Sequence, residues 1–211
     1  MISTKNYEAL PGKDQLHSIC KAAAVLDAII CPDWSSRYYS FNSKWSDDEE
    51  VCEIRNGSGD HVLILFKADD CIINGFAHEY IQPDKKRITT NLPDIFNEFI
   101  WGEPVNSIGT TFCLWTIKGA NWTTGDVENF NDNPGEMLAI FDAKPETYFN
   151  WATDYFEGYY KEDGLSLDTI VKIYNGELLT KEMIYSLVEE VEDWDQLEQD
   201  LLEINYPYSF T

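Results

Sequence analysis

The segment "VCEIRNGSGDHVLILFKADDCIINGF", residues 51–76, decides the fold because it alternates short apolar runs with tight polar turns. Its middle run, residues 61–66, is continuously apolar after the histidine, which is typical of a central strand covered on both faces. The polar turns at 56–60 and 68–70 join this run to a neighbouring strand on each side. The segment therefore predicts three consecutive antiparallel strands.

The glycine-rich turn "RNGSGD", residues 55–60, has two possible interpretations. A phosphate-binding loop aims backbone N–H groups and a helix N-terminus at the anion, but these glycines join strand to strand and no Gly-Lys-Ser/Thr follows. Gly57 and Gly59 better suit the positive-φ positions of a hairpin, with Asn56 and Asp60 completing the turn. A hairpin is the favoured interpretation, and a ligand-binding loop is the alternative.

The surrounding segments extend this arrangement. Apolar residues recur at three- and four-residue steps from Leu16 to Ile30, which predicts an N-terminal helix with Asp14 as N-cap and Pro32 as its stop. Further strands are expected in "SRYYSFNSKW" and "GTTFCLWTIKG", and a short helix in "NLPDIFNEFIWGEP", residues 91–104. The prediction is an α+β fold: an antiparallel meander of about five strands with an N-terminal helix, a short helix after strand four and a helical C-terminal region.

The C-terminal region, residues 136–211, reads as a series of helices. Asp193 and Gln196 have the spacing of a capping box, so the long apolar stripe that contains them is either one helix or two helices that divide there. A polar loop is expected at 120–136, and residues 158–166 are the one candidate hinge. We expect one domain over residues 1–211, in which 136–211 could form a helical subregion.

The formal net charge of −23 narrows the classes of partner. Binding of nucleic acid or of an anionic membrane needs lysine and arginine, so neither partner is expected. Residues 131–211 hold 19 acidic residues against 4 lysines, and no basic residue follows Lys181. Such a surface either keeps the protein soluble or attracts a basic partner.

The five cysteines are widely spaced, and four of them lie in apolar stretches. We interpret them as small buried residues in a reducing compartment, with no zinc site and no disulfide framework. The N-terminus shows no signal segment, and a cytoplasmic protein without a cofactor is expected.

Motifs for catalysis are weak in this sequence. It contains no Gly-x-Ser-x-Gly elbow, no His-Glu-x-x-His and no EF-hand loop. The best acid–base or metal-binding group is Asp69 and Asp70 with His78 and Glu79.

The seven tryptophans fall into two groups. Most of them fit apolar patterns and are expected in the core, including Trp45, Trp101, Trp115 and Trp151. Trp34 and Trp122 lie in polar loops and could be exposed.

Residues 51–101 resemble the SUKH superfamily in the order "EIRNGSGDHVLILF", "CIINGFAHE" and "LPDIFNEFIW". The resemblance implies a bacterial immunity protein that binds and silences a toxin domain. "YYSFNSKW" together with "RNGSGD" also resembles a second bacterial family, from which no function can be carried over.

The leading hypothesis is therefore a non-catalytic acidic protein that occludes a basic polypeptide such as a toxin domain. The expected partner-binding residues are the acids at two turns and the two loop tryptophans: Asp47, Asp48, Glu49, Glu50, Asp69, Asp70, Trp34 and Trp122. One alternative is a small enzyme or divalent-metal module that uses Asp69, Asp70, His78 and Glu79. Another is a scaffold subunit that self-associates through exposed aromatic residues; the oligomeric state is not predicted.

Overall fold

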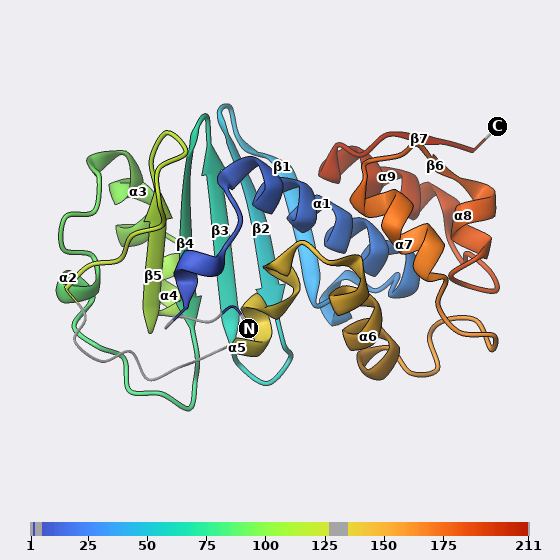
Figure 1. Cartoon of the computed structure of the whole chain (residues 1–211), viewed down its shortest axis with the longest axis horizontal. Coiled ribbons are helices and arrows are strands. Elements are labelled where there is room, and N and C mark those ends of the chain that lie inside the picture. The colour runs from blue at the N-terminus through green and yellow to red at the C-terminus, as the bar shows by residue number, and fades with distance from the viewer. Residues whose placement is uncertain (1, 3–5, 127–134, 211) are drawn as a thin grey trace.

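A five-stranded antiparallel sheet forms the centre of the fold in the computed structural model, which describes residue 2, residues 6–126 and residues 135–210 (Figure 1). The strands lie side by side in chain order, so the predicted α+β class and meander are confirmed. Half of the polar loop predicted at 120–136 lies outside the described residues. The strands are β1 (Tyr39–Ser46), β2 (Glu49–Arg55), β3 (His61–Lys67), β4 (Asp70–Phe76) and β5 (Phe112–Thr116).

Helix α1 (Lys13–Ile30) is the predicted N-terminal helix, and it packs beside β1 and against the C-terminal helices (Figure 1). The prediction of Asp14 as its N-cap is wrong, because Gly12 takes that position and Asp14 lies in the first turn. A carboxylate in the first turn still stabilises the helix through the macrodipole. The helix ends at Ile30, and its C-cap Cys31 comes directly before Pro32, as predicted.

The opposite face of the sheet is covered by short helices instead of the single helix predicted at 91–104. The chain turns out of the helix at Gly102, whose backbone is extended. A Cβ atom at Gly102 would lie 2.4 Å from the carbonyl oxygen of Glu98, so no other residue fits this turn without a shift. The short helices are α2 (Lys85–Ile88), η3 (Asp94–Phe96), α3 (Asn97–Trp101) and α4 (Val105–Ile108).

The central strand β3 is buried on both faces, as its unbroken apolarity predicts. Ile64 and Phe66 belong to the larger core, which they share with α1. Leu63 and Leu65 point to the other side and belong to a smaller core with Phe96 from η3. The period of two along a strand therefore divides the apolar residues of β3 between two layers of helices.

The glycine-rich turn after β2 is a hairpin, as favoured from the sequence. Gly57 and Gly59 have φ values of +72° and +108°. The side-chain Oδ1 of Asn56 accepts hydrogen bonds from the backbone N–H groups of Ser58 (2.9 Å) and Asp60 (3.0 Å). These bonds satisfy the polar backbone of the bend within the turn itself.

Gly75 in β4 is required by the ring of Phe112, which lies opposite it in β5. A Cβ atom at Gly75 would lie 1.9 Å from the Phe112 ring, and this ring is buried and cannot move aside without disturbing the core. We expect Gly75→Ala to lower the free energy of unfolding by about 1–3 kcal/mol. Urea denaturation followed by circular dichroism measures this loss, with Gly12→Ser as a control because a Cβ there meets nothing within 4 Å and serine is at least as good an N-cap as glycine. Equal stability of both variants would contradict the prediction.

The C-terminal region is helical; from residue 145 onward it lies beyond β1, whereas its first helix, residues 135–138, lies in front of the sheet in the view of Figure 1. Of the two alternatives for the long apolar stripe, the structure has two helices, and the Asp193 carboxylate caps the second by accepting a hydrogen bond from the backbone N–H of Gln196 at 3.0 Å. Its apolar side chains belong to the same core cluster as those of α1 and β1. The elements are α5 (Gly135–Leu138), η4 (Ala139–Asp142), α6 (Pro145–Tyr155), α7 (Leu167–Tyr174), β6 (Leu179–Thr180), α8 (Lys181–Tyr185), α9 (Trp194–Ile204) and β7 (Tyr208–Ser209).

A buried carboxylate at Asp27 connects three of these elements. Its Oδ2 accepts hydrogen bonds from the backbone N–H groups of Tyr38 (3.1 Å) and Tyr39 (2.7 Å), at the start of β1. Its Oδ1 accepts one from the hydroxyl of Tyr148 in α6 at 2.8 Å. Burial raises the pKa of Asp27 to about 7, although these hydrogen bonds oppose the rise.

A buried ion pair connects the segment after α1 to α9. The guanidinium of Arg37 donates to Asp200 Oδ2 at 2.6 Å and to the carbonyl oxygens of Cys31 and Pro32 at 2.8 Å each. Asp200 also accepts a hydrogen bond from the side chain of Gln196 at 3.1 Å. Both charged groups are therefore paired and hydrogen-bonded, which burial of a charge requires.

The five cysteines are buried and free, which confirms their interpretation as small core residues. Burial raises the pKa of the Cys20 and Cys71 thiols well above the usual value.

Within residues 6–126 and 135–210, no helix combines the length and the apolarity that crossing a bilayer requires.

Candidate functional site

The acidic turns predicted to bind a partner lie at one end of the sheet. The turn between β1 and β2 carries Asp47 and Asp48, and the turn between β3 and β4 carries Asp69. In a meander, alternate turns share an end, so the structure does bring these acids to the same edge. All three side chains are exposed.

Several acids of this sheet end interact with other groups of the protein. The Nζ atom of Lys67 lies 2.8 Å from Oε1 of Glu49 and 3.5 Å from Oδ2 of Asp48. Glu50 is hydrogen-bonded to His17 on α1. Asp70 is buried, and its carboxylate accepts a hydrogen bond from a backbone N–H group in the segment after β5. The sheet end is thus a surface of mixed charge.

The two loop tryptophans have different environments. Trp34, in η2 (Trp34–Ser36), is 51% exposed, and the guanidinium of Arg55 lies 3.9 Å from its ring centroid. Trp122 is only 7% exposed and donates a hydrogen bond to the carbonyl oxygen of Pro11 at 2.9 Å. The expectation that Trp122 could be exposed is therefore wrong, because its ring completes the core and its N–H group finds a backbone acceptor. Trp45 and Trp101, expected in the core, are instead 42% and 41% exposed.

The four residues of the alternative acid–base or metal group are not brought together. Asp69 and Asp70 lie at the start of β4, whereas His78 and Glu79 follow its end, so the length of the strand, about 20 Å, separates the two pairs. His78 instead hydrogen-bonds through Nδ1 to Asp60 in the β2–β3 turn at 2.8 Å. Among the described residues, no group of three or more histidine, cysteine or acidic side chains is arranged to hold a metal ion.

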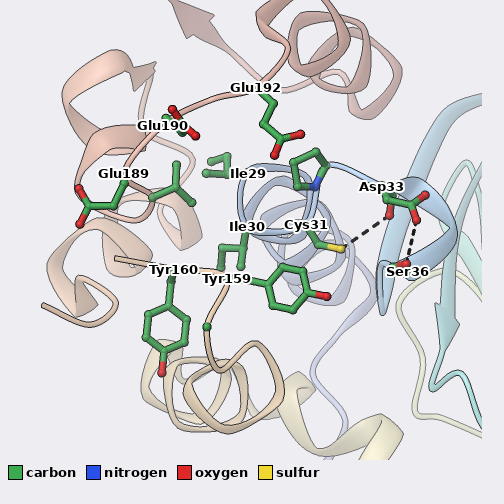
Figure 2. A pocket seen from close by; sticks show the side chains of 13 residues that line it. Ile29, Ile30, Cys31, Asp33, Ser36, Tyr159, Tyr160, Glu189, Glu190 and Glu192 are labelled. Atoms are coloured by element: carbon green, nitrogen blue, oxygen red, sulfur yellow. Dashed lines mark hydrogen bonds between the residues drawn. The ribbon is translucent and has the colours of Figure 1, made fainter. Parts of the chain in front are cut away.

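A cleft of about 500 Å³ opens at the end of α1, on the helical side of the molecule (Figure 2). We call it the acidic cleft. Its floor is the end of α1 with the residues that follow it, 29–33 and Ser36. Its walls are the α6–α7 loop at 158–160 and the α8–α9 segment at 188–190 and 192. Three parts of the chain that are far apart in sequence therefore meet around it.

The acids that line this cleft come from the α8–α9 segment and from Asp33, and no lysine or arginine of the described residues lines it. Figure 2 shows the carboxylate of Glu192 directed inward above the floor, whereas Glu189 points away from the cleft in that view. Asp33 accepts hydrogen bonds from Ser35 and Ser36, and these bonds lower the pKa of its carboxyl group. The cleft therefore keeps a negative charge over an apolar floor of buried residues such as Ile30.

Aromatic side chains extend the acidic cleft toward β1. A neighbouring hollow of about 460 Å³, which we call the aromatic cleft, shares Cys31, Ser36 and Tyr159 with it. Tyr155 in α6 also lines this second hollow, and the exposed fractions of Tyr159 and Tyr155 are 61% and 42%. The two clefts adjoin at these shared residues, and they differ in charge: Arg37 and Arg55 line the aromatic cleft, whereas only carboxylates among the charged groups of the described residues line the acidic cleft.

The sequence indicates the separate parts of these clefts but not their meeting. The acid run from Glu189 to Glu203 is visible as a possible acidic face, and Tyr159 falls in the candidate hinge at 158–166. Nothing in the sequence places these two segments against the end of α1. The backbone N–H of Lys161 donates to the carbonyl oxygen of Leu187 at 3.0 Å, and this contact joins the two walls.

No family model matches the chain, and neither a curated protein nor a solved structure matches it.

Proposed function

We propose that this chain is a non-catalytic binding protein that recognises a basic polypeptide and acts by covering its cationic surface. The observation that carries the proposal is the acidic cleft, where carboxylates gather over an apolar floor and, within the described part of the chain, no basic side chain lines the wall. A net charge of −23 adds a long-range attraction for a cationic partner. Such attraction raises the association rate and favours basic partners over acidic ones.

The resemblance of residues 51–101 to the SUKH superfamily supports a specific class of partner. Immunity proteins of that kind bind toxin domains, and a toxin that acts on nucleic acid needs a basic surface to hold it. An acidic protein that occupies this surface would block substrate binding without any chemistry. We therefore propose a cytoplasmic bacterial immunity protein that forms a stoichiometric complex with a basic toxin domain.

The proposal predicts a complex that salt weakens. We expect capture from the native host at about 50 mM salt to recover a basic polypeptide, because screening is weak at that ionic strength. The recovered polypeptide, once purified, is expected to rebind in a one-to-one complex whose Kd rises at least about tenfold on going to 200 mM salt. Analytical ultracentrifugation measures the stoichiometry, and the isolated chain serves as the control for self-association.

Two results would count against this function. The first is that no basic polypeptide is retained at low salt. The second is a partner whose affinity does not respond to salt, because an electrostatic interface between exposed charges must weaken as the Debye length shortens.

A further inference from the structure

We propose that the acidic cleft receives an arginine side chain from an extended segment of the basic partner, and that Tyr159 at its edge stacks on the guanidinium group. This inference rests on the proposed function and assigns it a place on the surface. It selects the helical side of the molecule over the sheet end, where the sequence alone placed most of the partner-binding residues.

Charge is the first argument for this choice. At the sheet end, Lys67 pairs with two acids of the β1–β2 turn, and a hollow beside Asp69 is also lined by Lys13 and Lys118. An incoming cation would have to compete with these lysines for the carboxylates. In the acidic cleft no such competitor from residues 6–126 or 135–210 lines the wall, and the inward-facing Glu192 meets the cation directly (Figure 2).

Shape is the second argument. The volume of about 500 Å³ lies within the range of roughly 300–1,000 Å³ that is typical of pockets for small ligands, so the cleft can hold a long side chain. Its floor at Ile29 and Ile30 is apolar, which suits the aliphatic stem of arginine. The adjoining aromatic cleft is lined by Arg37 and Arg55, so the cation is expected to stay on the carboxylate side of Tyr159.

The aromatic wall is the third argument, and it favours arginine over lysine. Tyr159 lines both clefts and is 61% exposed, so one face of the ring is open to a ligand. A guanidinium group is planar, stacks on aromatic faces and bonds carboxylates through two N–H groups at once, whereas an ammonium group acts as a point charge. Elsewhere in the protein, the guanidinium of Arg55 lies over the ring of Trp34 at 3.9 Å, which is the same kind of contact.

Binding of fluorescein-labelled tetra-arginine to the full chain, followed by fluorescence anisotropy at low salt, tests the inference. The double variant Glu190→Gln/Glu192→Gln is expected to raise the Kd about fivefold, because it removes two carboxylates of the acidic cleft. Tyr159→Ala is expected to raise the Kd about threefold, through loss of the stacking face. Tetra-lysine is expected to bind the unmodified chain about threefold more weakly than tetra-arginine.

The matched control is Asp47→Asn/Asp69→Asn, which makes the same change of net charge at exposed positions of the sheet end. It is expected to change the Kd less than about twofold. Equal losses in both double variants would overturn the docking site while leaving the proposed function intact, because the peptide would then follow net charge alone. Binding of a basic partner protein without binding of tetra-arginine would also overturn the docking site. Failure of every basic probe, protein or peptide, would overturn the function itself.

Discussion

Replacing Asp27 by alanine is expected to lower the free energy of unfolding by about 3 kcal/mol or more, because three buried hydrogen-bond donors lose their acceptor. Two of these donors are the backbone N–H groups of Tyr38 and Tyr39, which cannot turn toward another acceptor. The third is the hydroxyl of Tyr148 in α6, so the variant also loosens the contact between α1 and the C-terminal helices. Urea denaturation monitored by tryptophan fluorescence measures the loss.

Asparagine at position 27 is expected to behave differently from alanine. Its Oδ1 can accept both backbone bonds, while its Nδ2 donates to the Tyr148 hydroxyl, which is able to reverse its own role. This arrangement copies the protonated carboxyl group. We therefore expect Asp27→Asn to lie within about 1 kcal/mol of the unmodified protein at neutral pH.

Comparing the stability of the unmodified protein with that of Asp27→Asn across pH isolates the titration of Asp27. Its pKa is about 7 in the folded protein, whereas the ordinary value of 3.8 applies to the unfolded chain, so unfolding releases a proton between these values. Raising the pH from about 4 to 7 therefore lowers the stability of the unmodified protein relative to Asp27→Asn, and the difference levels off above pH 7. The size of this change is on the order of 3 kcal/mol.

Tyr148→Phe provides a control for the pH dependence. The Tyr148 hydroxyl lowers the pKa of Asp27 by bonding to its carboxylate, so its removal is expected to shift the folded-state titration to higher pH. Parallel pH profiles for the unmodified protein and Asp27→Asn would show that the carboxyl group does not titrate in this range. A loss of stability in Asp27→Asn as large as that in Asp27→Ala would show that the hydrogen-bond geometry is not what the structure indicates.

The sequence predicts the sheet well because the relevant signals are local. The period of β3 and the turn chemistry of Asn56, Gly57 and Gly59 each act within a few residues. The meander topology then follows from the tight turns, which allow only neighbouring strands to pair. The short helices on the far face are harder to predict, because their ends depend on single positions such as Gly102.

The candidate site is predicted less completely because it depends on contacts between distant segments. Asp47 and Asp69 share a sheet end, and the turn pattern alone indicates this. The exposure of Trp122 cannot be judged from its polar neighbours, since its partner is the carbonyl oxygen of Pro11, more than a hundred residues away. Likewise, the acidic run after Glu189 becomes a cleft only because the end of α1 lies beneath it.

The second large effect is expected at the buried ion pair between Arg37 and Asp200, whose exposed fractions are 4% and 8%. Asp200→Ala leaves the guanidinium buried without a counter-charge, which is expected to cost about 3–5 kcal/mol of stability. That loss is a large share of the roughly 5–15 kcal/mol that stabilises an ordinary domain. Urea denaturation measures it, and Glu198→Ala, on the same helix but only half-buried, is the matched control, expected to change stability by less than about 1 kcal/mol.

The double variant Arg37→Met/Asp200→Leu tests whether the ion pair itself stabilises the fold, or whether Asp200 is needed only to neutralise the buried guanidinium of Arg37. Because the attraction between the two groups only offsets their desolvation, the double variant is expected to be more stable than Asp200→Ala alone. Some loss will persist, since the guanidinium also holds the carbonyl oxygens of Cys31 and Pro32 in the floor of the acidic cleft. We therefore expect the double variant to fold yet bind tetra-arginine more weakly than the unmodified chain. Additive losses of stability from the two single substitutions would contradict this account, because they would mean that the two groups act independently.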